Sequence, residues 1–146
     1  MTTTTNTTTT ATTLDTKPAV GSIVRAGAIG IVIAAVLNMI LYFISTAIGA
    51  LPIMSSMGQL ITLMPVLTFT IGAGIGATIL YLILTRFLDH GRANTVFVVI
   101  ASLVLIGMAF GPITSVVEPT VIAVLLLEIM HLAAGLPLMY TLTKMT

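Results

Sequence analysis

The stretch TIGAGIGATIL, residues 70–80, decides the fold class of this chain. Gly72, Gly74 and Ala77 satisfy the G-x-G-x-x-G/A spacing of dinucleotide-binding loops. Such a loop needs a strand before the glycines, a helix after them and an acidic residue about 20 positions further on. Here the glycines lie midway along an uncharged apolar run, and the next acidic residue is Asp89. The stretch is therefore predicted to lie inside a membrane-spanning helix.

The composition extends this interpretation to the whole chain. The 146 residues are 58% hydrophobic and only 6% charged, whereas soluble domains carry roughly 25% charged residues. No Asp, Glu, Lys, Arg or His occurs in residues 26–85, and a second uncharged run covers residues 93–117. One span needs about 20 apolar residues. The first run therefore holds two helices, the second run holds one, and the apolar stretch after Pro119 holds a fourth.

These runs predict an all-α, polytopic membrane protein that folds as a bundle of four transmembrane helices. The helices are expected at about residues 23–47, 61–87, 93–112 and 119–143, within a transmembrane domain of residues 21–146. Eleven of the first 16 residues are threonines. A tract that can bury so little apolar surface is predicted to be disordered, and we expect residues 1–20 to form a cytoplasmic tail.

The basic residues predict the orientation. The chain has five Lys and Arg, at positions 17, 25, 86, 92 and 144. With four spans, all of these positions fall on one side of the membrane. Cytoplasmic loops carry an excess of Lys and Arg. We therefore expect a multi-pass protein of the cytoplasmic membrane with both termini in the cytoplasm.

Several classes of function are excluded or find no support. The chain has no cysteine, which excludes disulfides and thiolate metal sites. Its net charge of +1 provides no basic field for nucleic acid. The expected partners are the lipid bilayer and a second copy of the chain. No cofactor is expected and no serine spacing suggests a nucleophile, so an enzyme is not expected. An integral membrane protein of unknown role and a transporter are both favoured over a membrane-embedded enzyme or a haem protein, which ranks third.

Small residues four apart are typical of close helix packing in lipid. Gly72 and Gly76 have this spacing, and Ala73 and Ala77 repeat it one residue later. The first helix has Gly30 and Ala34, and the third has Gly107 and Gly111. We expect these residues to pack helices within one chain. A contact between two copies of the chain is the alternative for Gly72 and Gly76.

The fourth helix carries the main candidate for chemistry. Glu128 and His131 are three residues apart, so they share one helix face. At 1.5 Å per residue from Thr120, they lie roughly 12 and 17 Å into the helix. An ionisable group at such a depth is costly, and it marks a functional hypothesis. Asn38 and Tyr42 of the first helix lie on a small and polar stripe at a matching depth, so we expect all four side chains to lie near one another.

Two interpretations of this cluster stay open. Interhelical hydrogen bonds are ordinary helix contacts, which makes the cluster a structural clamp in a protein of unknown role. Alternatively, it belongs to a proton-coupled transporter of a small solute or an ion, acting as an oligomer. A metal site is not expected, because the Glu-x-x-His pattern occurs once and His90 lies in a distant loop. Gly135 and Pro137 mark a candidate hinge, since proline removes a helical hydrogen bond.

A resemblance supports this interpretation. The resemblance to a known family rests on five parts of the sequence. They are Arg25-Ala-Gly, Asn38, the stretch LMPVLTFTIGAGIGATILYLI (residues 63–83), the Gly-Pro at 111–112, and LLLEIMHLAAGLPL (residues 125–138) with its Met-His pair. Together they resemble a family of small bacterial four-span membrane proteins known only as a domain of unknown function. The resemblance covers about residues 22–144. It implies a four-helix bundle, and it implies no activity and no catalytic residue.

Overall fold

The computed structural model describes residues 17–111, 116–117 and 120–146, and most of them lie in four long α-helices. The helices are α1 (Val20–Ala47), α2 (Leu63–Phe87), α3 (His90–Met108) and α5 (Val121–Lys144). Each is long and apolar enough to cross a membrane. The described residues contain two isolated β-bridges and no strand. The expected all-α fold with four candidate spans is therefore confirmed.

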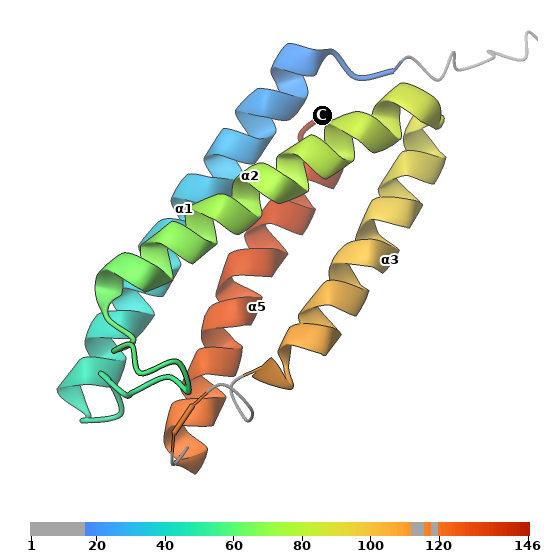
Figure 1. Ribbon diagram of the computed structural model, residues 1–146. Helices are drawn as coiled ribbons and strands as arrows, with labels where there is room; N and C mark the ends of the chain where they lie inside the picture. The colour runs from blue at the N-terminus through green and yellow to red at the C-terminus, as the bar shows by residue number, and fades with distance from the viewer. Residues whose placement is uncertain (1–16, 112–115, 118–119) are drawn as a thin grey trace, which may run out of the picture.

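The helices run up and down in turn (Figure 1). The start of α1, the α2–α3 connection and the end of α5 consequently lie at the same end of the bundle. We call this the charged end, because every Lys and Arg of the chain lies within a few residues of one of these three points in the sequence. The other end, which carries residues 48–62, is the loop end. The expected grouping of the basic residues at one end is thus present.

The ends of the helices follow local chemistry. α1 begins three residues before its expected start, directly after Pro18 and Ala19. α2 begins two residues late, so that Pro65 falls in its first turn, where the missing N–H is tolerated. The hydroxyl of Thr120 accepts a hydrogen bond of 3.2 Å from the amide of Ala123 and caps α5. The predicted disordered tail covers residues 1–20. Residues 1–16 lie outside the described residues, and Val20 is the first residue of α1.

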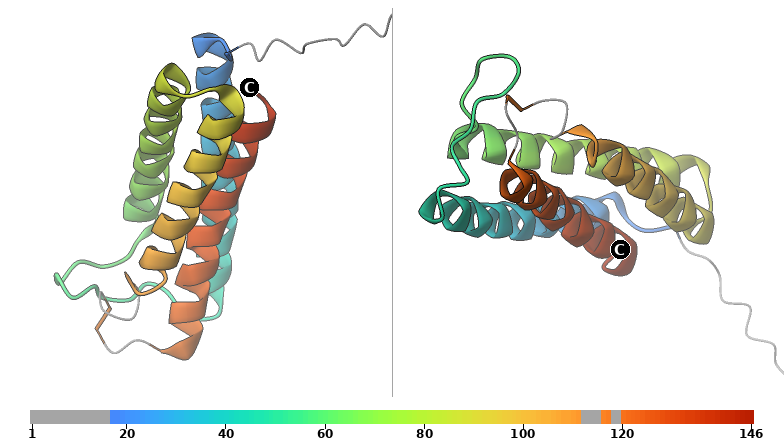
Figure 2. Two further views of the ribbon diagram at one scale, coloured as in Figure 1. Left: turned by 90° about the vertical axis from the view of Figure 1, so that its right-hand side faces the viewer. Right: turned by 90° about the horizontal axis from the view of Figure 1, so that it is seen from below.

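The bundle is unevenly packed. α1 lies between α2 and α5 and contacts both along its length, whereas α3 contacts α2 and α5 and makes no contact with α1 (Figure 2). The buried residues of α3 are Ala93 and Phe97, both in its first two turns. α3 is therefore held mainly at the charged end.

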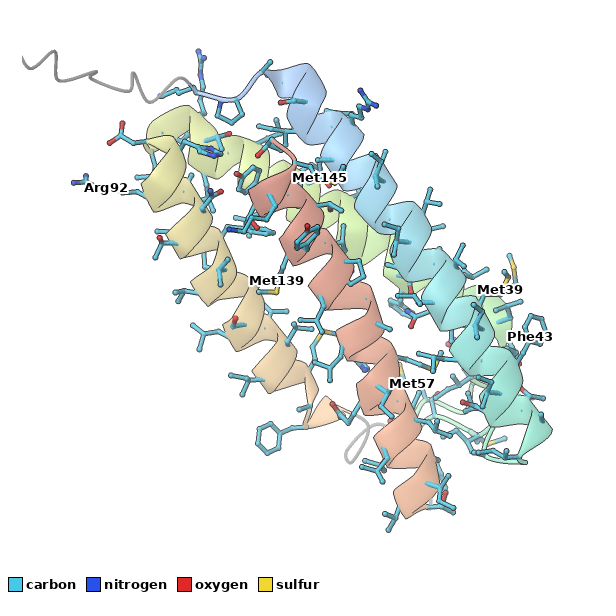
Figure 3. The ribbon with its side chains drawn as sticks, turned by 180° about the vertical axis from the view of Figure 1, so that it is seen from behind. Met39, Phe43, Met57, Arg92, Met139 and Met145 are labelled. Carbon is cyan, nitrogen blue, oxygen red and sulfur yellow. The ribbon has the colours of Figure 1, made fainter. Side chains whose placement is uncertain are left out.

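The bundle is apolar outside and partly polar inside. The buried face of α2 consists of Thr70, Gly74, Thr78, Tyr81 and Thr85. The outward faces carry large aliphatic and aromatic side chains. On α1, for example, Met39 and Phe43 point away from the other helices (Figure 3). Lipid tails are as apolar as leucine, so in a bilayer helices associate through close packing and interhelical hydrogen bonds. This distribution suits hydrocarbon surroundings.

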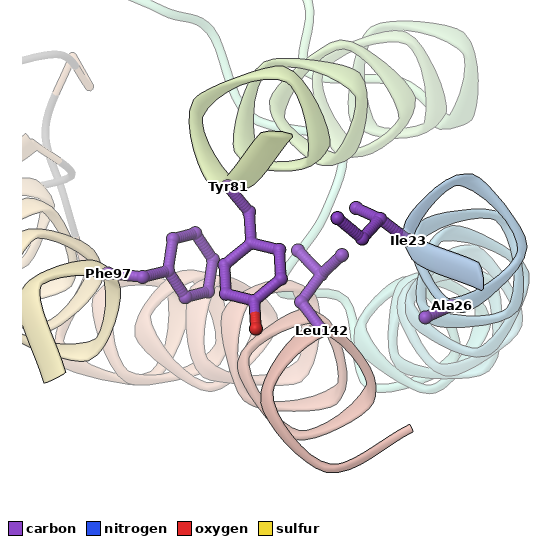
Figure 4. Close-up of a cluster of buried hydrophobic side chains, with 5 residues drawn as sticks. All are labelled: Ile23, Ala26, Tyr81, Phe97 and Leu142. Carbon is purple, nitrogen blue, oxygen red and sulfur yellow. The ribbon is translucent and has the colours of Figure 1, made fainter. Parts of the chain in front are cut away.

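All four helices meet in one apolar cluster near the charged end (Figure 4). Tyr81 of α2 is fully buried, and its ring lies edge-on to Phe97 of α3, with the ring centroids 5.1 Å apart. Leu142 of α5 and Ile23 and Ala26 of α1 complete the cluster. This cluster anchors α3, because it contains Phe97, one of the two buried residues of that helix.

A second cluster closes the loop end. Leu51 and Val116 pack with Leu127 and Met130 of α5, and Tyr42 lies against them. The loop of residues 48–62 folds back on itself and pairs with the segment before α5 through a bridge between Ser55 and Val116. The loop therefore packs against the N-terminal half of α5.

Candidate functional site

A buried hydrogen bond joins α1 to α2. The amide nitrogen of Asn38 donates to the hydroxyl oxygen of Thr70 at 2.8 Å, and that hydroxyl donates to the carbonyl of Val66 at 2.8 Å. Asn38 is 3% exposed. Its carbonyl oxygen, Oδ1, is buried and has no hydrogen-bond partner within the described ranges. Asn38 is thus a half-satisfied polar group in the interface between α1 and α2.

Two glycines of α1 let neighbouring helices approach closely. A Cβ built on Gly27 would lie 2.7 Å from the methyl carbon of Thr78 on α2. A Cβ on Gly30 would lie 2.5 Å from the hydroxyl oxygen of Thr141 on α5. Both threonine hydroxyls donate to carbonyls of their own helices. These contacts therefore depend on shape and need no polar partner on α1. Ala34, one turn beyond Gly30, is fully buried.

The expectation that Gly72 and Gly76 pack helices within the chain is wrong. Both are exposed, and a Cβ built on either would meet nothing within 4 Å. Ala73 is exposed as well, while Ala77 is half-buried against the apolar cluster near the charged end. The glycine used inside the chain is Gly74, which lies against Ile31 of α1. The G-x-x-x-G pair lies on the outward side of α2, because residues two apart on a helix point in different directions.

The same correction applies to α3. A Cβ built on Gly107 or Gly111 would meet no neighbouring atom within 4 Å, and Gly107 is exposed. The glycine in the contact between α3 and α5 is instead Gly135, which belongs to α5. A Cβ on Gly135 would lie 2.7 Å from a methyl carbon of Leu105.

Glu128 and His131 lie on the same side of α5 as Gly135. Gly135 contacts α3, and it follows Glu128 by seven residues and His131 by four, so the three share one face. Glu128 Oε1 is buried and has no hydrogen-bond partner in the described part of the chain. A carboxyl oxygen in this position can accept a hydrogen bond or, when protonated, donate one.

His131 is bonded to its own helix. Its Nδ1 lies 2.7 Å from the carbonyl oxygen of Leu127. A carbonyl oxygen only accepts, so Nδ1 carries the hydrogen and Nε2 is the basic nitrogen of the neutral ring. The Nε2 atom is the one that can bind a proton or a ligand.

The four members of the expected polar cluster thus have different partners. α1 and α5 do meet, as expected. However, Asn38 bonds to α2 and Tyr42 packs against the cluster at the loop end, while Glu128 and His131 share a face of α5 with Gly135, which contacts α3. Among the described residues, no hydrogen bond joins Asn38 to Glu128 or His131. Sequence reasoning missed Thr70 as the partner of Asn38.

A second polar group lies at the charged end, and sequence reasoning missed it too. The Tyr81 hydroxyl donates to Asn94 Oδ1 of α3 and lies 3.2 Å from the Thr146 hydroxyl. Asn94 Nδ2 lies 3.4 Å from His90 Nε2. The contacts connect α2, α3 and the residues after α5. The signal for them was the spacing of Tyr81 and Asn94 on either side of the α2–α3 connection.

The remaining candidates concern a hinge and a metal. α5 is one continuous helix from Val121 to Lys144 with Pro137 inside it. The candidate hinge at Gly135 and Pro137 stays a prediction. Among the described residues, no three His, Cys, Asp or Glu side chains lie close enough to hold a metal ion.

Comparison with known proteins gives the family and no activity. A family model described as a family of unknown function, DUF6069, matches residues 18–146, which include all four helices. No curated protein and no solved structure matches the chain. The resemblance drawn from the sequence is confirmed, and this chain belongs to DUF6069, a family of unknown function.

Proposed function

We propose that this protein is a non-enzymatic integral protein of the cytoplasmic membrane, with both termini in the cytoplasm. The observation that carries the proposal is the grouping of every Lys and Arg at one end of four helices of membrane-spanning length. Cytoplasmic segments carry an excess of these residues. In this role the Asn38–Thr70 bond and the glycine contacts of α1 hold the helices together, which is the ordinary use of such groups in lipid.

The absence of native cysteine allows a direct test of orientation. Single cysteines are introduced at Ser56, which is exposed in the loop at the loop end, and at Asp89, which is exposed between α2 and α3. Intact cells are treated with a membrane-impermeant maleimide. We expect labelling at position 56 in intact cells and at position 89 only after permeabilisation. The reverse pattern would overturn the orientation, and recovery of the protein in the soluble fraction would overturn the membrane assignment.

The proposal includes a homodimer. Gly72, Ala73 and Gly76 form an outward-facing row on α2 that no other part of the described chain covers. Small residues at this spacing let two helices approach closely in lipid. A second copy of α2 is the partner that this row fits.

A proton-coupled transporter is the second candidate, and Glu128 favours it. A buried carboxyl oxygen without a partner in a membrane-spanning helix is costly. Infrared spectroscopy of the protein in lipid, wild type against Glu128→Gln, tests this candidate. A Glu128 carboxyl band that titrates and shifts in D₂O would support proton exchange at the site. A band that neither titrates nor responds to D₂O would leave Glu128 as part of the helix packing and would reject proton coupling.

A further inference from the structure

The outer side of the α1–α5 interface contains an apolar groove of about 500 Å³. Ile33 and Leu37 of α1 form one wall, and Ile129, Leu136 and Tyr140 of α5 form the other. Ala133 forms part of the lining midway along α5. Its short side chain leaves space there, while the Gly30–Thr141 contact holds the two helices together beside the groove. The lining is almost wholly apolar, so the groove fits hydrocarbon.

The length of the groove matches one leaflet of a bilayer. Ile129 and Tyr140 are 11 residues apart on α5, which corresponds to about 16 Å along the helix. Half of the hydrocarbon core of a typical bilayer is about 15 Å thick. A single acyl chain lying along the groove would therefore extend from the middle of the membrane to its surface.

Two cations lie at the charged end of the groove. Lys144 follows Tyr140 by four residues, so it continues the same face of α5. On α1, Arg25 begins the row of every fourth residue that passes through Ile29 to Ile33 and Leu37. Gly30 lies against Leu138 and Thr141. Because α1 and α5 are antiparallel, Arg25 is level with the last turn of α5.

Both cations are exposed. In the part of the chain that the structure describes, neither has a hydrogen bond or an ion pair, whereas the Lys17 ammonium donates to the carbonyl of Arg86 at 3.1 Å. Arg25 and Lys144 are thus available to an anion at the membrane surface. A second copy of the chain is a poor occupant, because it would bring its own cations to the same place.

We propose that the groove binds a phospholipid with an anionic headgroup. One acyl chain lies along the groove between α1 and α5, and the phosphate lies between Arg25 and Lys144. Basic sites between membrane helices are suited to anionic lipid headgroups. The proposal requires a bilayer around the helices. It depends neither on which side of the membrane the charged end faces nor on any role of Glu128.

Native mass spectrometry of the full chain, released from detergent micelles, tests the site. Phosphatidylglycerol and phosphatidylcholine with identical acyl chains are the probes. We expect the wild type to retain phosphatidylglycerol preferentially. The double variant Arg25→Gln/Lys144→Gln should weaken phosphatidylglycerol binding roughly 20- to 30-fold, since each cation near an anionic surface contributes about a fivefold factor. The matched control, Arg86→Gln/Arg92→Gln, removes the same charge at the same end and should keep most of the binding.

A second pair of variants tests the acyl chain. Ala133→Leu fills the groove from α5, and Ile33→Trp fills it from α1 at a position that is 42% exposed. Both should reduce retention of either lipid while the variants stay folded. If one variant fails to fold, the other still gives the result. Equal loss in the two charge variants would show a general surface effect and overturn the site. Unchanged binding after the groove is filled would overturn it as well.

Discussion

Gly30 of α1 lies against Thr141 of α5, and a methyl group at position 30 would come within 2.5 Å of the threonine hydroxyl oxygen and 3.2 Å of the Leu138 Cα. The nearest backbone cannot move without shifting α5. This contact fixes the distance between the two helices that pack most extensively. It is a contact of shape, since the Thr141 hydroxyl donates to the carbonyl of Leu138 in its own helix.

Gly30→Ala should therefore lower the free energy of unfolding by about 1–3 kcal/mol, the usual cost of adding a methyl group to a filled interior. Denaturant titration of the protein in bicelles measures it. Gly107→Ala is the matched control, because a Cβ at Gly107 would meet no neighbouring atom. The control should be neutral or slightly stabilising. An equal loss in both variants would contradict the importance of the Gly30 contact.

The outward row on α2 gives a prediction about self-association. Gly72→Ile and Gly76→Ile should abolish the homodimer, because a large side chain prevents the close approach of two helices. Neither substitution should lower the stability of the monomer, since both positions are open within the chain. Energy transfer between labelled copies, followed as the protein is diluted into lipid, measures association. Association that persists in both variants would remove this surface from the dimer.

The bond between Asn38 and Thr70 is suited to a double-mutant cycle. Asn38→Ala and Thr70→Val each remove one partner, and the coupling between the two changes should be about 0.5–2 kcal/mol. Thr70→Ser is the control, because it keeps the hydroxyl that accepts from Asn38. Unfolding of the four proteins in bicelles provides the values. Strict additivity would mean that the bond contributes nothing to stability.

Tyr81 should hold α3 through its hydroxyl as well as its ring. Tyr81→Phe removes the contacts to Asn94 and Thr146 and should cost about 1–2 kcal/mol. Hydrogen exchange should rise first in α3, which depends on this end of the bundle. Tyr140→Phe is the control, because Tyr140 is 65% exposed, and it should change stability by less than about 0.5 kcal/mol. Faster exchange throughout the protein, with no preference for α3, would argue against this role.

The helices were predictable because hydrophobic length and charge placement alone determine them. The uncharged runs give four spans. The basic residues before the first span and after the last one lie on the same side of the membrane only if the number of spans is even. The meeting of α1 and α5 was also foreseen. The number and the lengths of the helices depend on how the chain divides between water and hydrocarbon, and each segment decides this by its own composition.

The helix faces were harder to predict. The pair Gly72 and Gly76 matched a packing pattern, yet the inward face is the row Thr70, Gly74, Thr78, Tyr81 and Thr85. Its spacings of three and four, combined with small and hydroxyl side chains, were visible in the sequence. A local pattern such as G-x-x-x-G shows that two helices can approach there, but not whether the partner helix belongs to the same chain.

The sequence identified the polar residues of the candidate site but not the contacts that they make. Asn38, Glu128 and His131 stood out as polar groups inside apolar helices. Their partners depend on the rotation of each helix about its axis and on which helices are neighbours. Similar depth along the helices led to the prediction that Asn38 and Glu128 lie together. The rotation of α1 about its axis instead directs Asn38 to Thr70 of α2.

The unequal lengths of α1 and α3 have a mechanical consequence. α1 has 28 residues and α3 has 19, which correspond to about 42 and about 28 Å. A hydrocarbon core of about 30 Å fits α3 upright, whereas α1 must lean or extend beyond the core. In a bilayer of this thickness, hydrophobic mismatch therefore acts on α1 rather than on α3.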